Sequence, residues 1–583
     1  MHKILPKQTA SMYTRDGIRL DADIYRPDAE GEFPVLLMRQ PYGRAIASTV
    51  VYAHPKWYAA HGYIVVIQDV RGRGTSAGEF QLFTHEIADG EDTVNWAAKL
   101  PGSNGKVGMY GFSYQGMTQL YAAAAKPPAL KTICPAMIGY DLYTDWAYEG
   151  GAFCLQTNLA WAIQLATETA RLRKDQTAYE ALFAASRNLP VTNPEILQEL
   201  APESFYHQWL TYSHPDTYWE KLSPKTHLQN VDLPIFHIGG WFDTYLRGTW
   251  HLYQDMSDGQ SPAFPTERSA NGDRSTQPQH LIIGPWAHLP WGRQVGEVDF
   301  GVNAVSPVDQ MQVRWFDQFL KGINTGLLEE DPVCLFEIGS NIWHSYPTIP
   351  IVNQKSYFLS TTGLANIRED SGTLSPNSQA QIPNAFDVLV HDPWRPVPAL
   401  GGHAAMPAGV FERSACSSAS LSHLDCRADV LTYTSEPLTE NCHLLGNVAV
   451  EIFCSADQPS YDLCAVLSEV HPDGCVYNLT QGYVHCPPGS KDAPTKIQLQ
   501  PICARIAQGN ALRLSLSAAC FPAYAMNSGS GTVRSSGELM NAQVITITVN
   551  CGDDFPSQVL LPLRVSFTQR RKDAKKKKKK KKS

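Results

Sequence analysis

One serine lies in a glycine-flanked segment whose pattern could make it a nucleophile: KVGMYGFSYQG at Lys106–Gly116. Gly111 precedes Ser113 by two positions and Gly116 follows it by three, so the segment approaches the G-x-S-x-G pattern without matching it. In that pattern a strand ends, the backbone turns sharply at the serine and a helix begins, which exposes the hydroxyl at the sheet edge. The adjacent helix N-terminus favours negative charge that develops during a reaction. Ser113 is therefore a candidate nucleophile.

A serine nucleophile needs a general base, and the base needs a carboxylate that orients it. On a strand–turn–helix scaffold of this kind, the acid and then the histidine follow the serine, each after a strand. Asp243 follows the apolar run PIFHIGG, and His288 follows HLIIGPWA. These positions favour a triad with Ser113 over the alternatives, which are a helix N-cap for Asp243 and a backbone-bonded loop histidine for His288. His237 lies within its strand and is interpreted as a core histidine.

The elements that would position these residues alternate along the first third of the chain. Apolar runs bounded by turns predict strands, and apolar residues at helical spacing predict helices. The predicted strands are Val35–Gln40, Tyr63–Gln68, Lys106–Gly111 and Thr132–Ile138, and the predicted helices are Asp89–Leu100 and Met117–Ala125. Strand signals return at 234–239 and 280–283, and a helix is expected at 310–320. Such alternation implies a mostly parallel sheet covered on both faces.

Two further regions depart from this rhythm. From about residue 140 to 230 the pattern is helical and rich in aromatics, which predicts a helical cap inserted into the α/β domain. After about residue 332, short β-prone runs separated by turn residues predict an antiparallel sandwich or jelly roll. The predicted organisation is an α/β domain at 1–140 and 233–331, a helical cap at 141–232, a jelly-roll domain at 332–570 and a disordered lysine-rich tail at 571–583.

Composition and charge exclude several classes of protein. The chain of 583 residues is 43% hydrophobic and 18% charged, which is ordinary for a soluble globular protein, and its apolar runs fall short of a membrane span. The net charge is −8, of which the run Lys575–Lys582 contributes eight positive charges, so an acidic body of −16 remains and no nucleic-acid partner is expected. Met1–Arg15 lacks a signal-peptide pattern, so we expect a cytoplasmic location. The 13 cysteines include no CxxC pair, so we expect them to be buried, reduced thiols. We expect neither a metal nor a cofactor.

Further segments resemble the CocE/NonD family of serine hydrolases, which contains cocaine esterase, cephalosporin acylases, α-amino-acid ester hydrolases and Xaa-Pro dipeptidyl-peptidases. The resemblance extends to about residue 570 and is carried by RQPYGR (39–44), QDVRGRGTSAGEF (68–80), DGEDTVNWAAKL, NGKVGMYGFSYQG, GGWFDTY, GPWAH, HDPWRPVPALGG (391–402) and LTYTSEPL (431–438). It implies an α/β hydrolase with a helical cap and a C-terminal jelly roll. The S-Y-x-G motif of the family also accounts for the position of Gly116, three residues after Ser113.

The resemblance also implies roles for individual residues. Ser113 becomes the nucleophile, His288 the general base and Asp243 its orienting acid. The oxyanion hole would use the hydroxyl of Tyr42, in the P-Y motif, and the backbone N–H of Tyr114.

Aromatic residues are candidates for the walls of the substrate pocket. Trp146 and Trp161 fall in the cap, where the family places such walls, although a role in the cap core is an equal alternative. Tyr245, two residues past Asp243, is expected to face the site.

The charged residues Asp69 and Arg71 end a strand and could be taken for part of the site. We interpret them instead as a structural ion pair that braces the glycine-rich turn Gly72–Gly78. That turn lacks the Gly-Lys-Ser/Thr ending of a phosphate-binding loop.

The substrate is expected to be a small-molecule ester or amide. In the α-amino-acid ester hydrolases, part of a carboxylate cluster that binds the substrate ammonium follows the catalytic Asp, whereas Thr244–Arg247 contains no acid. This departure favours an esterase or acylase with a neutral, aromatic acyl pocket. The alternatives are an Xaa-Pro dipeptidyl-peptidase and, from another class, a carbohydrate-binding protein with an inactive hydrolase domain. The intact set of Ser113, Asp243, His288 and Tyr42 favours an enzyme.

Overall fold

The structure of the protein is a computed structural model. It describes residues 1–45, 49–188, 191–257, 277–378, 382–401, 422–487, 493–531 and 539–564. The predicted lysine-rich tail, the end of the predicted jelly roll after residue 564 and Gly402 of the segment 391–402 lie outside the described residues.

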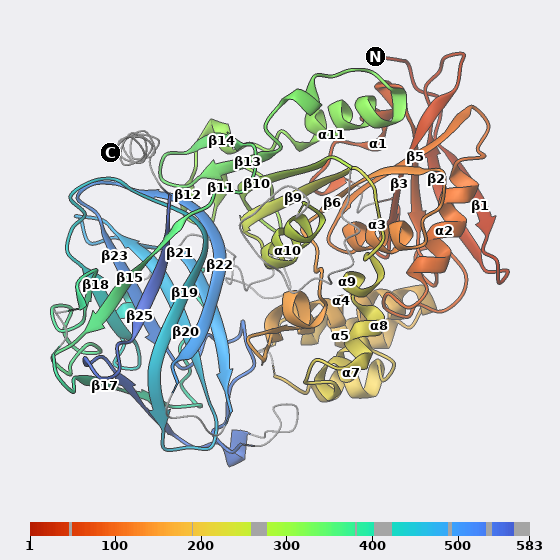
Figure 1. The fold of residues 1–583 in the computed structure, drawn as a ribbon. Helices are drawn as coiled ribbons and strands as arrows, with labels where there is room; N and C mark the ends of the chain where they lie inside the picture. The colour runs from red at the N-terminus through yellow and green to blue at the C-terminus, as the bar shows by residue number, and fades with distance from the viewer. Residues whose placement is uncertain are drawn as a thin grey trace, which may run out of the picture.

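A ten-stranded sheet forms the framework of the N-terminal part (Figure 1). Its order is β1 (Gln8–Tyr13), β2 (Arg19–Tyr25), β4 (Ile64–Asp69), β3 (Phe33–Gln40), β5 (Ser103–Phe112), β6 (Leu130–Ala136), β9 (Ile235–Phe242), β10 (Gln279–Ala287), β13 (Val333–Glu337) and β14 (Ile342–Tyr346). The seven central strands, from β4 to β13 in this order, run parallel to one another. The pairs β1–β2, β2–β4 and β13–β14 at the two edges are antiparallel.

Both faces of this sheet are buried, because side chains that alternate along each strand pack into two different cores. On β3, Val35 and Leu37 join one core, and Leu36 and Met38 join the other. Helices α2 (Glu86–Ala97) and α3 (Tyr114–Ala124) cover the first face, and α1 (Pro55–Ala60) and α11 (Val308–Phe316) cover the second. The predicted parallel sheet with helices on both faces is confirmed.

The predicted strands and helices of this part are present, with shifted ends. The helix predicted at Asp89–Leu100 begins three residues earlier, at Glu86, and the helix predicted at Met117–Ala125 begins at Tyr114. The strand predicted at 280–283 extends to Ala287, so it ends directly before His288.

The segment between β6 and β9 is helical, as the sequence predicts. It contains α4 (Leu155–Arg173), α5 (Gln176–Ala185), α6 (Glu195–Leu200), α7 (Phe205–Thr211), α8 (Thr217–Leu222) and α9 (Pro224–His227), preceded by the short strands β7 (Tyr148–Glu149) and β8 (Ala152–Phe153). The cap helices, orange to yellow in Figure 1, gather below the sheet. Its buried aromatics, including Trp161 and Trp209, belong to the same core as α2 and α3, so the cap packs directly onto the α/β domain.

The C-terminal part is β-rich, and its core is continuous with one end of the N-terminal sheet, since residues such as Trp241, Leu281 and Leu335 belong to the same buried cluster. Its strands, green to blue in Figure 1, are β15 (Asn353–Ser360), β16 (Thr373–Ser375), β17 (Phe386–His391), β18 (Leu431–Ser435), β19 (Cys442–Ala456), β20 (Tyr461–Val470), β21 (Val476–Cys486), β22 (Thr495–Ile506), β23 (Ala511–Ser517), β24 (Ile545–Asn550) and β25 (Gln558–Leu563). The hairpin β13–β14 follows residue 332 but pairs with β10, so the N-terminal sheet continues past the predicted boundary at 331.

None of the described helices has the length and apolar character that crossing a bilayer needs, and the cytoplasmic location stays a prediction. The described cysteines are free thiols, in agreement with the prediction. Most are buried or partly buried, but Cys426 is exposed, so the prediction of burial is wrong there. That residue lies in the turn directly after the short helix α12 (Ser422–Asp425).

Three parts of the chain meet at one buried ion pair. Arg247, on α10 (Leu246–Ser257), lies 2.9 Å from a carboxylate oxygen of Glu149 in β7. The hydroxyl of Tyr524, from the C-terminal part, donates a 2.6 Å hydrogen bond to the same carboxylate. Because Arg247 and Glu149 are both almost fully buried, each depends on the other to offset its lost hydration.

We predict that Arg247→Met strongly destabilises the protein. The substitution leaves the Glu149 charge buried without its cation, which costs roughly 3–5 kcal/mol in comparable sites. Thermal and urea unfolding of the full chain measure the loss. Arg293→Met is the matched control, because the Arg293–Asp299 pair is about half exposed and such pairs contribute roughly 0–1 kcal/mol. Equal unfolding midpoints for the two variants would contradict the prediction.

Candidate active site

Ser113 lies at the sharp turn between β5 and α3, as the sequence predicts. Its backbone has φ 58° and ψ −127°, a conformation rare for a residue with a side chain. Gly116 makes this turn possible: a Cβ there would lie 2.4 Å from the Ile138 side chain and 2.9 Å from the carbonyl oxygen of Ala136. A glycine three residues after the serine therefore lets α3 pass close to β6. Gly116 thus allows the close packing although it stands one position later than in the G-x-S-x-G pattern.

Asp243 and His288 are brought together as the sequence predicts. They follow β9 and β10, which are parallel neighbours, and His288 Nδ1 lies 2.8 Å from Asp243 Oδ1. A carboxylate oxygen only accepts, so Nδ1 donates and Nε2 is left as the basic nitrogen. Both side chains are buried, with 3% and 0% of their surfaces exposed. The His288 ring lies 5.4 Å from the ring of Phe112, the residue before Ser113.

Tyr42 follows β3, and its side chain extends toward Ser113 and lies near the side chain of that residue. Its hydroxyl accepts a 3.1 Å hydrogen bond from Nε1 of Trp161 in α4. Burial raises the pKa of Tyr42 to about 12, so the hydroxyl keeps its proton at neutral pH. The predicted oxyanion tyrosine therefore lies beside Ser113 as a neutral donor.

The N–H of Tyr114 is the first of α3, and the first N–H groups of a helix have no acceptor within it. The side chain of Tyr114 points into the core, where its hydroxyl donates a 2.7 Å hydrogen bond to Glu86. Glu86 is held by Arg39 at 2.6 Å, and Arg39 donates a 2.8 Å hydrogen bond to Gln68. This buried network fixes the start of α3, and sequence reasoning missed it because its members lie far apart along the chain.

The predicted aromatic walls form one continuous group next to His288. The Tyr245 ring meets His288 edge-on at 5.1 Å, and Trp146 packs on Tyr245 at 4.2 Å and on Trp161 at 5.1 Å. All three rings are almost fully buried. Trp146 and Trp161 thus belong to the cap core and also adjoin the site.

Two buried carboxylates flank Trp146, and sequence reasoning missed both. Asp145 accepts from Nδ1 of His251 at 3.1 Å, and Glu149 pairs with Arg247. Their only sequence signal was the placement of two acids around a tryptophan in an otherwise aromatic stretch. Among the described residues, no group of three or more His, Cys, Asp or Glu side chains is arranged to hold a metal ion.

The predicted ion pair between Asp69 and Arg71 is wrong. Asp69 accepts from the backbone N–H of Arg44 at 2.6 Å and pairs with the guanidinium of that residue. Arg71 pairs instead with Asp16 at 2.7 Å and Asp89 at 2.6 Å. The turn folds back so that Gly74 lies against the Asp69 carboxylate, where a Cβ would come within 2.0 Å of an oxygen, and this backbone encloses Asp69 while Arg71 reaches α2. Both residues still brace the turn.

His237 is a core histidine, as predicted. Its side chain is fully buried in β9, and Nε2 lies 3.0 Å from Oε1 of Gln279. Burial lowers the pKa of His237 to about 4, so the ring is neutral near pH 7.

A central parallel sheet whose successive strands lead to a serine on a tight turn, an acid and a histidine defines the class of α/β hydrolases. Comparison with known families agrees and is more specific. Residues 16–290 match the X-Pro dipeptidyl-peptidase (S15 family), and residues 309–560 match the X-Pro dipeptidyl-peptidase C-terminal non-catalytic domain. The two matches follow one another along the chain, which belongs to the X-Pro dipeptidyl-peptidase (S15) family.

Individual relatives cover nearly the whole chain. Cocaine esterase of Rhodococcus sp. (strain MB1 Bresler) is 29% identical over 585 residues, which span 94% of this chain and 97% of that protein. An α-amino-acid ester hydrolase superimposes with a TM-score of 0.77 at 22% identity, covering 97% of both chains. An aminopeptidase from the marine sediment archaeon Thaumarchaeota archaeon superimposes with a TM-score of 0.77 at 21% identity, covering 96% of both chains. The two structures share the fold.

We predict that Gly116→Ala destabilises the protein by roughly 1–3 kcal/mol, the usual cost of forcing an extra methyl into a packed site. The methyl would push α3 away from β6 at the turn that holds Ser113. Urea unfolding measures the change. Gly292→Ala is the control, since a Cβ there meets no atom within 4 Å. Unfolding midpoints that agree for these two variants would show that the close approach of α3 and β6 is not needed.

Proposed function

We propose that this enzyme hydrolyses carboxylic esters or acyl amides of small molecules through an acyl-enzyme formed on Ser113. The observation that carries the proposal is the 2.8 Å bond between His288 and Asp243, both buried, beside a serine held at a positive φ. This arrangement combines a nucleophile, a base and a group that orients the base, as nucleophilic catalysis by serine requires.

The reaction proceeds in two acyl-transfer steps. The Oγ of Ser113 attacks the substrate carbonyl carbon while Nε2 of His288 takes the hydroxyl proton. The C–O or C–N bond to the leaving group then breaks, and the imidazolium gives its proton to the departing alcohol or amine. Water attacks the acyl-enzyme by the same route, which releases the carboxylic acid and returns the proton to Ser113. Asp243 stabilises the imidazolium in both steps.

Negative charge on the carbonyl oxygen is stabilised by two donors, the N–H of Tyr114 and the hydroxyl of Tyr42. The support for Tyr42 is its place near Ser113, the hydrogen bond from Trp161 that holds its oxygen, and its raised pKa, which keeps the proton on that oxygen. Preorganised donors in a site that excludes water stabilise a developing oxyanion strongly.

The charges near the aromatic wall favour a neutral acyl group over a peptide with a free N-terminus. An X-Pro dipeptidyl-peptidase needs carboxylates to bind the substrate ammonium. The carboxylates next to Trp146 are already engaged, Glu149 by Arg247 and Asp145 by His251. A panel of aryl esters, acyl amides and Xaa-Pro anilides tests this choice, and preferential cleavage of the anilides would support the peptidase instead.

We predict that a fluorophosphonate probe labels Ser113 and that Ser113→Ala abolishes both labelling and turnover. Without its nucleophile, a triad enzyme retains only roughly 10³–10⁴-fold catalysis over water. Mass spectrometry of the labelled peptide and initial rates on an aryl ester provide the measurements, with circular dichroism to confirm folding. An unlabelled, folded wild-type chain would favour the carbohydrate-binding alternative with an inactive hydrolase domain.

We predict that Tyr42→Phe lowers kcat by on the order of 10²–10³-fold, the usual effect of losing one oxyanion donor, with KM little changed. Because the pKa of Tyr42 is raised to about 12, the ratio of wild-type to variant kcat should stay constant from pH 8 to 10. A tyrosine with an ordinary pKa near 10 would instead lose half of that ratio by pH 10. A loss of only a few-fold in kcat at every pH would remove Tyr42 from the mechanism.

A further inference from the structure

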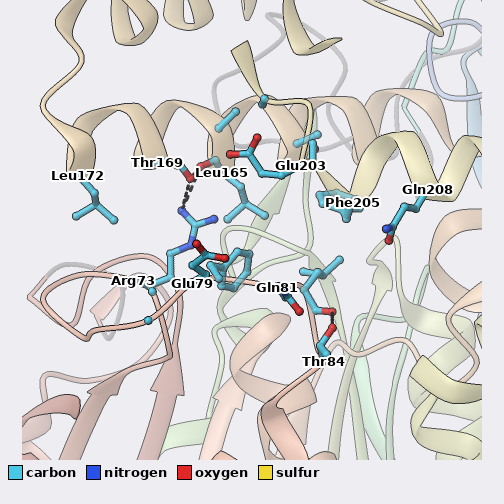
Figure 2. A pocket seen from close by; sticks show the side chains of 18 of the residues that line it. Arg73, Glu79, Gln81, Thr84, Leu165, Thr169, Leu172, Glu203, Phe205 and Gln208 are labelled. Atoms are coloured by element: carbon cyan, nitrogen blue, oxygen red, sulfur yellow. Dashed lines mark hydrogen bonds between the residues drawn. The ribbon is translucent and has the colours of Figure 1, made fainter. Parts of the chain in front are cut away.

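A cavity of about 920 Å³ lies between the glycine-rich turn and the cap, apart from the proposed catalytic group. Its described lining includes neither Ser113 nor His288. Its lining includes Arg73 of the turn and, on the opposite side, Leu165 and Thr169 of α4 and Phe205 of α7 (Figure 2). A volume of this size suits a small organic ligand.

Three charged residues lie at or just before the glycine-rich turn: Asp69, Arg71 and Arg73. Among them, only Arg73 has no opposite charge beside it in the described part of the chain. Asp69 and Arg71 both form ion pairs, whereas no carboxylate of the described residues lies within 4 Å of the Arg73 guanidinium. Its Nη1 donates to the carbonyl oxygen of Leu165 and to the hydroxyl of Thr169, each at 3.1 Å. Figure 2 shows the guanidinium reaching from the turn toward α4.

The remaining donors of Arg73 lie on one edge of the guanidinium. Its Nε is buried without a hydrogen-bond partner, and Nη2 has no acceptor among the described residues. The Phe80 ring lies 3.9 Å from the guanidinium carbon and holds its plane. Only 3% of Arg73 is exposed. The Nε–Nη2 edge of an arginine is the fork that binds a carboxylate through two parallel hydrogen bonds.

The carboxylates near this cavity do not compensate the charge of Arg73. Glu168 pairs with Arg171 at 2.7 Å, and Glu203 pairs with Arg173 at 3.3 Å. Glu79 also lines the cavity but is exposed on the turn. Burial lowers the pKa of Arg73 to about 10, so the guanidinium remains charged near pH 7. A buried, uncompensated cation is costly, and an anionic ligand would offset that cost.

We propose that this cavity is a binding site for an organic acid, whose carboxylate is held by the Nε–Nη2 edge of Arg73. The apolar body of the acid packs against Phe80, Phe205 and Trp209, which line the same cavity. The site adjoins the oxyanion side of the active site, because Leu165 lies one helical turn, about 6 Å, after Trp161 on α4, and Trp161 binds Tyr42.

The experiment measures binding of a matched pair of probes, 3-phenylpropanoate and the neutral 3-phenylpropanamide, to the full chain by calorimetry. A charged, bidentate contact predicts that the acid binds roughly ten- to a hundredfold more tightly than the amide. Arg73→Gln should abolish this preference. Arg173→Gln is the matched control, because it removes an exposed, already paired arginine from the same cavity and should keep the preference within about twofold.

Three results would overturn the proposal. The first is equal binding of acid and amide by the wild type, and the second is an undiminished preference for the acid in Arg73→Gln. The third is acid binding that appears only in Glu79→Gln, which would mean that the Glu79 carboxylate itself binds the Arg73 guanidinium in the wild type. If Arg73→Gln does not fold, Arg73→Lys replaces it, since a lysine keeps the charge without the fork and should reduce the preference.

Inhibition of aryl-ester hydrolysis by 3-phenylpropanoate then identifies the source of the ligand. Competitive inhibition indicates the acid part of a substrate or product, and non-competitive inhibition indicates a separate small molecule. The binding preference is expected in both cases and in Ser113→Ala. Failure of the proposed hydrolysis would therefore leave the calorimetric result intact, and the two proposals fail separately.

Discussion

The backbone of Ser113 is held at φ 58°, and the surrounding structure must maintain that conformation. Residues with side chains adopt such angles at a cost on the order of 1–3 kcal/mol, which packing elsewhere has to offset. Here β5 is fixed by parallel pairing with β3 and β6, and the N–H of Ser113 donates a 2.9 Å hydrogen bond to the carbonyl oxygen of Ala136 in β6. With both sides of the turn fixed, the hydroxyl stays at the carboxyl edge of the sheet, where Asp243 and His288 also lie.

The same constraint extends to both proposed oxyanion donors through one buried group of charges. Arg39 lies on β3, three residues before Tyr42, and its partner Glu86 lies on α2. Glu86 also accepts from Tyr114, the first residue of α3. A strand and two helices are thereby tied to one ion pair, which connects the backbone segments that carry both proposed donors. Donors held in place in this way need no reorganisation when charge develops.

Local sequence patterns predicted the parts of this arrangement that depend on local structure. Strand, turn and helix around Ser113 follow from apolar runs and glycines, and Asp243 and His288 follow from the ends of two buried strands. Contacts set by the topology left no such signal. Arg71 pairs with Asp89 on α2 rather than with its near neighbour, and Glu149 meets Arg247 across about a hundred residues. The pairing of β13 with β10 likewise depends on the path of the whole chain, which no short pattern records.

The cap contacts one of the proposed oxyanion donors directly, through the hydrogen bond between Trp161 and Tyr42. The indole nitrogen of Trp161 can only donate, so the Tyr42 oxygen accepts from it and the tyrosine proton must point elsewhere. In the proposed mechanism the Ser113 hydroxyl gives its own proton to His288, and the Tyr42 proton is therefore available to the oxyanion. The helical insertion thus holds the oxygen of a donor that belongs to the α/β domain.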